Sequence, residues 1–137
     1  MEKMTVRIMT PDEIVFEGQA TRIDACGWDG YFTILPHHAP MAASLGIGEI
    51  EIDIEGEGED EIVKNFVAID SGIAEVAANH VDILTQLATM AKERGAATVK
   101  MAKEQDERQK QNIKGRDQLI KSEMELYRLL SQANESL

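Results

Sequence analysis

The sequence predicts an antiparallel β domain followed by a helical arm. Over most of the first 85 residues, apolar and polar side chains alternate with the period of two that is typical of half-buried strands. These stretches are short and are separated by Gly, Pro and Asn turns, with no long helix between them. Such a pattern favours a sandwich or barrel over a parallel sheet. From about Thr85 the apolar spacing changes to three and four, which is typical of a helix.

The β domain is expected to contain nine or ten short strands. Turn residues such as Pro11, Gly18, Pro36 and Gly72 interrupt the apolar stretches and predict their ends. The predicted strands cover residues 5–9, 14–16, 20–25, 31–35, 41–45, 49–55, 62–69, 73–77 and 81–84.

The clearest alternation lies in residues 49–55, where three isoleucines alternate with acids. Period two places Ile50, Ile52 and Ile54 on one face and the carboxylates on the other, so this strand is expected to be half-buried. The Gly56-Glu57-Gly58 segment then predicts a turn, because glycine tolerates a positive φ.

The arm carries two apolar stripes at helical spacing. The first is made of small residues and comprises Leu87, Ala88, Ala91, Gly95, Val99 and Ala102. The second is larger and comprises Ile113, Ile120, Met124, Tyr127 and Leu130. The polar residues 103–112 separate them, and Asn112 and Gly115 are weak helix breakers. Both a two-helix hairpin and a nearly straight arm are compatible with this pattern.

Charge also divides the chain of 137 residues, whose net charge is −11. Residues 1–87 hold 17 acids and 4 bases, a net charge of −13, whereas residues 88–137 hold 8 acids and 10 bases, a net charge of +2. With the change of periodicity, this predicts two domains, at residues 1–86 and 87–137. An acidic chain is unsuited to nucleic acid, because phosphate binding requires a basic surface.

Nothing in the sequence predicts a membrane span or a secretory signal. No apolar run approaches the roughly 18 residues of a spanning helix, and residues 1–10 lack the pattern of a signal peptide. The single cysteine, Cys26, permits no intrachain disulfide and is expected to be a buried residue of a strand. We therefore expect a protein that is kept inside the cell.

The residues provide no catalytic or metal-binding constellation. His37 and His38 are adjacent on an extended segment and would point to opposite sides. The acidic stretch 49–61 lacks the order of a calcium loop, and no glycine-rich phosphate loop or nucleophile elbow occurs. This favours a protein-binding role without catalysis, metal or cofactor. A ligand- or carbohydrate-binding β sandwich with a helical tail, or a hydrolase using paired acids, remain as alternatives.

Three stretches together resemble the epsilon subunit of bacterial F-type ATP synthases. They are Thr10-Pro11-Asp12-Glu13-Ile14-Val15-Phe16-Glu17-Gly18; Gly30-Tyr31-Phe32-Thr33-Ile34-Leu35-Pro36-His37-His38-Ala39-Pro40-Met41; and residues 66–76, Phe-Val-Ala-Ile-Asp-Ser-Gly-Ile-Ala-Glu-Val, followed by Val81-Asp82-Ile83-Leu84. They occur at the spacings of that family. Thr85 stands where the family often has Ala.

The resemblance implies a ten-stranded antiparallel β sandwich with a C-terminal two-helix domain. It implies a subunit of the central stalk that binds gamma and the ring of c subunits and couples ring rotation to the catalytic head. Such a subunit lies at the cytoplasmic face of the cell membrane as part of the complex. The helical arm would contact the alpha and beta subunits and could inhibit ATP hydrolysis.

The resemblance also implies contact residues by position. Trp28, Asp29 and Tyr31 would face the c ring, although the family often has Glu in place of Tyr31. Thr10, His38 and Met41 would contact gamma. In the arm, the inhibitory candidates are Lys110, Lys114, Arg116, Ile120, Lys121, Tyr127 and Arg128. The ATP-binding motif of some bacterial members, I/L-D-x-x-R-A, is absent, so no cofactor is expected.

Overall fold

The computed structural model describes residues 1–110, 124 and 128–130. Within this part, the strands are β1 (Met4–Met9), β2 (Ile14–Ala20), β3 (Arg22–Gly27), β4 (Gly30–Ile34), β5 (Met41–Leu45), β6 (Gly48–Glu55), β7 (Ile62–Ile69), β8 (Gly72–Ala77), β9 (His80–Thr85) and β10 (Ala88–Ala91). Residues 96–110 form a helix, here called the arm helix, and residues 124 and 128–130 are also helical. The predicted order of strands followed by helix is confirmed.

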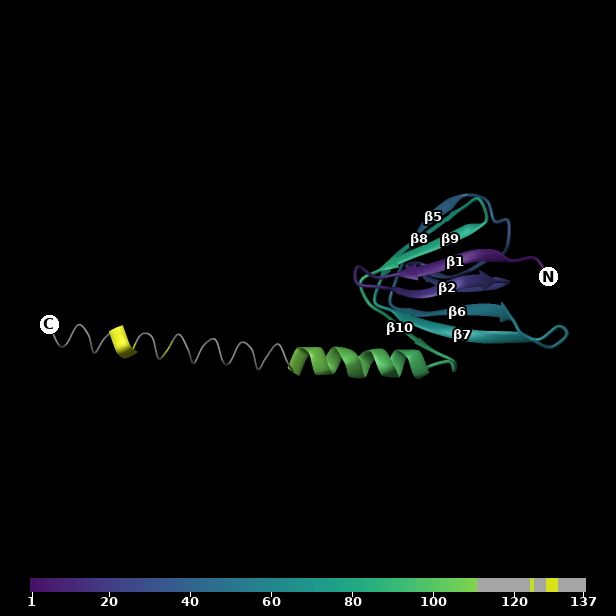
Figure 1. Cartoon of the computed structure of the whole chain (residues 1–137). Helices are drawn as coiled ribbons and strands as arrows, with labels where there is room; N and C mark the ends of the chain where they lie inside the picture. The colour runs from purple at the N-terminus through teal and green to yellow at the C-terminus, as the bar shows by residue number, and fades with distance from the viewer. Residues whose placement is uncertain (111–123, 125–127, 131–137) are drawn as a thin grey trace. The chain divides into compact units, whose positions relative to one another are not determined.

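The strands form two layers of a sandwich (Figure 1). Hydrogen bonding follows the order β10-β7-β6-β3-β5-β8-β9-β1-β2, and β4 pairs with β3. Only Gly27 and Leu45 join β3 to β5. The first layer is therefore β10-β7-β6-β3-β4 and the second is β5-β8-β9-β1-β2.

One strand pair departs from the predicted antiparallel arrangement. Strands β1 and β9 run parallel, with Val6 opposite Val81 and Met9 opposite Leu84. Parallel strands require a long connection, and most of the sandwich lies between these two in the sequence. The remaining pairs are antiparallel.

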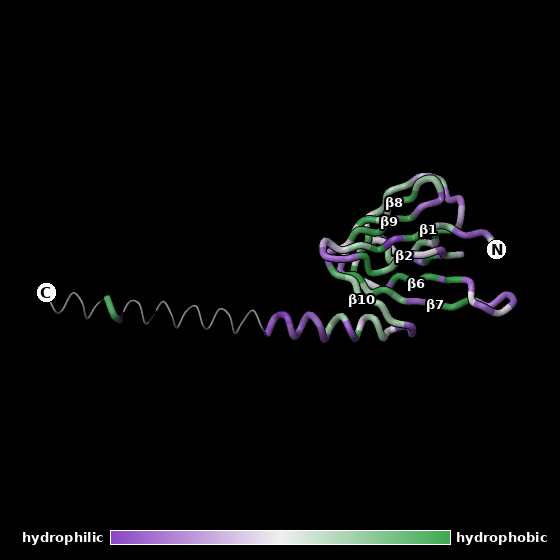
Figure 2. The backbone as a smooth tube through the Cα atoms, viewed as in Figure 1, coloured by the Kyte–Doolittle hydropathy of each residue, from purple (hydrophilic) through white to green (hydrophobic). Residues whose placement is uncertain are grey.

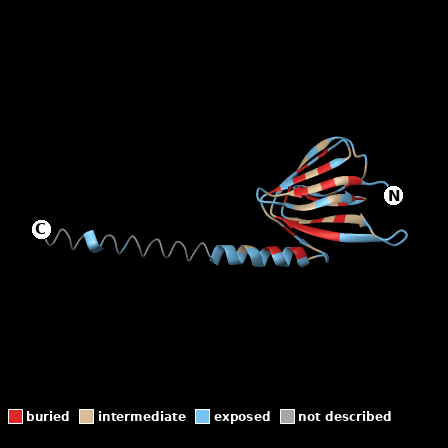
Figure 3. Cartoon of the chain, in the orientation of Figure 1, coloured by how far each residue is buried: buried red, intermediate tan, exposed pale blue. Residues whose placement is uncertain are grey.

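The core lies between the two layers and follows the period-two pattern (Figures 2 and 3). Ile50 and Ile52 of β6 are fully buried, and Ile54 packs against the core from its partly exposed end. Val6 and Ile8 of β1, in the other layer, belong to the same core cluster and are also fully buried. The predicted inward face of residues 49–55 is confirmed, and it gives the domain a stiff, densely packed interior.

The expectation that the helix begins near Thr85 is wrong. Residues 88–91 form β10, in which Ala88 pairs with Ile69 and Ala91 with Phe66 of β7. The unpaired edge of β7 offers backbone hydrogen bonds to this segment, and tertiary pairing outweighs a weak helical pattern. In the arm helix, the buried residues are Ala97 and Met101, whereas Val99 and Ala102 of the predicted stripe are exposed.

The chain divides into two compact units, Met1–Met101 and Ala102–Leu137. The first unit thus contains all ten strands and the first residues of the arm helix. The division of binding roles between residues 1–86 and 87–137 stays a prediction. Among the described residues, no helix is long and apolar enough to cross a membrane.

Candidate interaction surfaces

The outer face of the second layer carries a row of exposed apolar side chains across four strands. Ile73 of β8 pairs with Leu84 of β9, Leu84 pairs with Met9 of β1, and Met9 pairs with Ile14 of β2. Ile73, Leu84 and Ile14 are 48%, 45% and 51% exposed. We call Met9, Ile14, Ile73 and Leu84 the apolar row. A continuous row of this kind is typical of a protein-binding surface.

A groove of about 400 Å³ runs beside the apolar row. Thr10, Pro11, Ser71 and Gln86 complete its lining together with Met9, Gly72, Ile73, Leu84 and Thr85. Gly72 must be glycine here, because a Cβ atom would collide with the Leu84 carbonyl oxygen. The sequence-predicted contact Thr10 therefore lies at the edge of an apolar, open surface.

A row of charged side chains, which contains the ion pair between Arg7 and Asp82, borders the apolar row. It is the neighbouring row of outward-facing residues on the same four strands. Its members pair across the strands in the order Glu75, Asp82, Arg7 and Glu17. Arg7 Nε lies 3.2 Å from Asp82 Oδ1. The apolar row thus has a charged margin on one side, as the polar rim of a binding site does.

The structure does not bring the other two predicted gamma contacts next to Thr10. Met41 pairs with Val76 at the opposite end of β8, and it packs against the core rather than pointing outward. His38 lies in the preceding loop, where its Nδ1 is 2.7 Å from the Ala39 carbonyl oxygen. These residues stay candidates, but they form a second location and not one cluster with Thr10.

The three predicted ring contacts lie on or next to the turn between β3 and β4. Trp28 and Tyr31 are 74% and 68% exposed, and Asp29 is exposed as well. The turn has two residues, with Gly27 opposite Gly30. Gly30 has a φ of 135°, which glycine adopts readily.

A residue that sequence reasoning missed belongs to the same end of the sandwich. Ile47, in the loop between β5 and β6, is 85% exposed. The Trp28 amide donates to the Ser44 carbonyl at 3.0 Å, and the Gly46 amide donates to the Cys26 carbonyl at 2.9 Å, so this loop is tied to the β3–β4 turn. We call Trp28, Tyr31 and Ile47 the apolar tip. The sequence signal for this exposed residue is an isoleucine between two glycines, Gly46 and Gly48.

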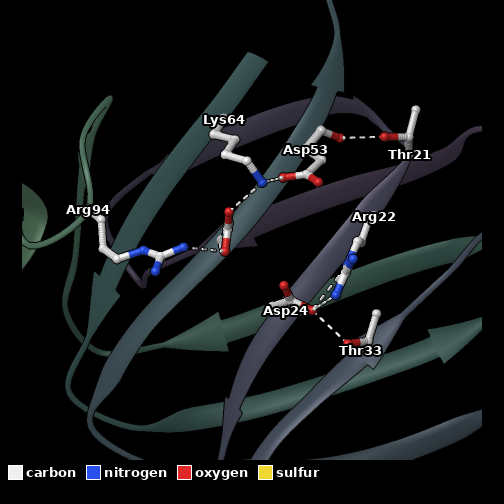
Figure 4. A network of polar contacts seen from close by, with 8 residues as sticks. Thr21, Arg22, Asp24, Thr33, Asp53, Lys64 and Arg94 are labelled. Atoms are coloured by element: carbon white, nitrogen blue, oxygen red, sulfur yellow. Dashed lines mark hydrogen bonds and ion pairs between the residues drawn. The ribbon is translucent and has the colours of Figure 1, made fainter. Parts of the chain in front are cut away.

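The outer face of the first layer is acidic and is neutralised by ion pairs (Figure 4). Lys64 Nζ lies 2.7 Å from Glu51 Oε1 and 3.2 Å from Asp53 Oδ1. These two carboxylates, first Glu51 and then Asp53, raise the pKa of Lys64 by hydrogen bonding. Asp24 accepts from Arg22 and Thr33 on the same face. Because these carboxylates are paired with neighbouring basic or hydroxyl side chains, we interpret them as stabilising the sheet rather than binding a ligand.

His37 and His38 both make hydrogen bonds within the β domain. The His37 amide donates to Asn79 Oδ1 at 2.8 Å, and His37 has a φ of 65°. Among the described residues, no group of three or more His, Cys, Asp or Glu side chains could hold a metal ion. Cys26 is buried, and burial raises the pKa of its thiol.

Two of the predicted arm residues fall within the described part of the chain. Lys110 is exposed and forms an ion pair with Asp106 at 3.2 Å, and Arg128 is exposed. Lys114, Arg116, Ile120, Lys121 and Tyr127 lie outside the described residues.

Comparison with known proteins defines the class of this β sandwich. The family model of the ATP synthase delta/epsilon chain β-sandwich domain matches residues 3–91. The ATP synthase epsilon chain of Rickettsia prowazekii is 36% identical over 87 residues, covering 64% of this chain and 75% of that protein. That of Anoxybacillus flavithermus is 34% identical over 111 residues, covering 81% and 78%. The chain belongs to the ATP synthase delta/epsilon chain family, and these two relatives are epsilon chains.

The match to a third relative covers less of both proteins. The epsilon chain of Leptospira borgpetersenii is 37% identical over 83 residues, and the match spans 61% of each protein. Among solved structures, a chain of the mitochondrial ATP synthase of Euglena gracilis, determined as OSCP/F1/c-ring, superimposes with a TM-score of 0.59 at 23% identity. That match covers 75% of this chain and 62% of the other. At this identity the likeness shows the fold.

Proposed function

We propose that this chain is the central-stalk epsilon subunit of a rotary ATP synthase. In this role it couples rotation of the c-subunit ring to ATP synthesis or hydrolysis in the catalytic head. The observation that carries the proposal is the apolar row, an exposed apolar surface on a β sandwich of the epsilon family. A packed β domain deforms little under load, which suits a part that transmits torque.

Gamma is the proposed partner of the apolar row. Three side chains of the apolar row, Ile14, Ile73 and Leu84, are between 45% and 51% exposed. Burying a large aliphatic side chain contributes about 1.5–3 kcal/mol. The groove that includes Thr10 gives the partner a recess to fill, and the row of Arg7 and Asp82 gives the interface a polar margin.

The c ring is the proposed partner of the apolar tip. The family resemblance implies Trp28, Asp29 and Tyr31 as ring contacts, and exposed Ile47 would enlarge the same surface. Tyr31 replaces the Glu that the family often has, so the contact of this chain relies more on apolar burial than on charge. Asp29 supplies a carboxylate beside the tip.

The proposal assigns no chemistry to the chain, which acts without a cofactor, metal or active site of its own. Catalysis belongs to the alpha and beta subunits of the head, and the chain resides at the cytoplasmic face of the membrane through the complex. The arm would contact those subunits through its basic residues, including Lys110 and Arg128. Substituting Asp for Ile120 and Tyr127 is expected to relieve any inhibition of hydrolysis by the arm.

The experiment combines binding with ATP hydrolysis by a purified catalytic head that contains gamma. The full-length chain is compared with a truncation after Met101, which retains the first compact unit. A truncation at Ala88 would remove β10 and uncover β7, so it is not a suitable variant. Binding of both forms, with lower hydrolysis only for the full chain, supports coupling plus inhibition. Binding with equal hydrolysis supports coupling alone.

Absence of binding to the head by either form would overturn the proposal. A carbohydrate- or ligand-binding sandwich would then be the next candidate, with Trp28 and Tyr31 as exposed aromatic platforms.

A further inference from the structure

The arm helix is capped by a carboxylate that comes from the β domain. The Gly95 carbonyl accepts the helical hydrogen bond of the Val99 amide, at 3.1 Å, so Gly95 occupies the N-cap position. Glycine has no side chain to cap a helix. Glu49 of β6 takes the place of the missing capping side chain. Its Oε1 accepts a hydrogen bond from the Gly95 amide at 2.8 Å, and its Oε2 accepts one from the Thr98 amide at 3.2 Å.

A single carboxylate thereby satisfies the two amides that a capping box satisfies with two side chains. The negative charge also lies at the positive end of the helix dipole, which adds a favourable interaction. Because Glu49 belongs to a central strand of the first layer, this cap holds the helix start to the sandwich as well as stabilising the helix.

Arg94 provides a second attachment immediately before the helix. Its guanidinium lies 5.8 Å from the centre of the Phe66 ring, within the range of a cation–π contact. Its Nη2 also lies 3.4 Å from Glu51 Oε2 (Figure 4). Both partners belong to the outer face of the first layer, on β7 and β6.

An apolar cluster provides the third attachment. Phe66 and Ala68 of β7 pack with Ala97 and Met101 of the arm helix, and all four are buried. Beyond Met101 the pattern changes, because residues 102–104 and 106–110 are exposed. The compact units of the chain divide at the same place, between Met101 and Ala102.

We propose that Glu49 is a positioning residue that keeps residues 95–101 fixed to the β domain, and that any movement of the arm begins beyond Met101. The first helical residues would then be a mount for the arm rather than part of its moving portion. The mount itself does not depend on the proposed function; only its consequence for the arm within the complex rests on it.

Amide hydrogen exchange of the free full-length chain tests the mount. The first amides of a helix have no intrahelical partner, so slow exchange at Gly95 and Thr98 reports the cap and not the helix. Glu49→Gln is expected to speed exchange about tenfold or more at one or both of these amides, with the β7 amides unchanged. Glu57→Gln, an exposed carboxylate of the β6–β7 hairpin, is the control and should change neither. Equal exchange in the wild type and in Glu49→Gln would overturn the role of Glu49.

The point at which arm movement begins, here called the hinge, is tested by repeating the amide hydrogen-exchange measurement on the chain bound to the gamma-containing head. Residues 95–101 should exchange within about twofold of their rates in the free chain, and within the arm the changes on assembly should be confined to residues from 102 onward. Loss of protection over residues 95–101 on assembly would place the hinge earlier and overturn the inference. A chain that does not bind the head defeats the proposed function, whereas the measurement on the free chain still decides whether the mount exists.

Discussion

The carboxylate of Asp70 lies 3.2 Å from the hydroxyl of Thr85 and 3.3 Å from the backbone amide of Leu87. Thr85 Oγ1 is also within hydrogen-bond distance of the Ser71 and Leu87 carbonyl oxygens. Asp70 follows β7, Thr85 ends β9, and Leu87 precedes β10. These contacts therefore fix the crossing by which the chain passes from one layer to the other.

Thr85→Ala is expected to destabilise the protein. The substitution removes a hydroxyl that is almost fully buried and leaves the Asp70 carboxylate with one partner fewer, a cost of about 1–3 kcal/mol. Urea unfolding measures the difference. Thr98→Ala, at an exposed position, is the control and should change stability by less than about 0.5 kcal/mol. A similar small effect at Thr85 would mean that this network contributes little.

Ala78→Gly is expected to stabilise the hairpin between β8 and β9. Ala78 and Asn79 have φ values of 50° and 60°, which is the left-handed conformation of a type I′ turn. An L-residue with a Cβ atom pays about 1–2 kcal/mol there, and glycine recovers part of this after its larger loss of chain entropy. We expect a gain of about 0.5 kcal/mol in the free energy of unfolding. Ala77→Gly, within β8, should instead be destabilising.

The stability of the protein should fall at alkaline pH because of Cys26. Burial raises the pKa of this thiol, so the folded state holds the proton more tightly than the unfolded chain. The stabilisation is fully present below the unfolded pKa of about 8.5 and is lost as the pH rises from there through the folded pKa. Cys26→Ala should have a flatter stability profile in this range when both proteins are unfolded with urea. Parallel profiles would contradict the assignment to Cys26.

The sandwich could be predicted because each inward face is encoded locally. Ile50 and Ile52 alternate with acids on one strand, and period two alone assigns them to the core. The segment of β10 could not be predicted in this way, because the spacing of Leu87, Ala88 and Ala91 suits a helix as well. Pairing with the free edge of β7 decides its structure, and no local pattern reports that edge.

The candidate surfaces were predictable only in part, for a related reason. The resemblance implies Trp28, Asp29 and Tyr31 as ring contacts because they lie in one short motif, and this role stays a prediction. Ile47 becomes their neighbour through the contact between β3 and β5, which the sequence does not show. Likewise, the apolar row exists because β1 and β9 pair although they are more than 70 residues apart.

Leu84→Glu is expected to weaken binding to a gamma-containing head. Leu84 lies in the middle of the apolar row, and a buried carboxylate without a partner opposes association. We expect a loss of about 10–100-fold in affinity, which is the range of a central interface residue. Because Leu84 is 45% exposed, the fold should be retained. Ile62→Glu, at a 38% exposed position on β7, is the matched control. Equal affinities for the two variants would place the gamma interface elsewhere.

The apolar tip makes a prediction that separates the ring from the catalytic head. Trp28→Asp together with Ile47→Asp should lower ATP synthesis driven by an ion gradient in reassembled membranes, because two exposed apolar anchors become charged. The same variant should support normal binding and hydrolysis with the detached head, since neither residue belongs to the apolar row. Ile62→Asp serves again as the control for an added charge on the sandwich. If synthesis were unchanged by the double substitution, the tip would not be the ring contact. If binding to the detached head fell as well, the tip would belong to the gamma interface instead.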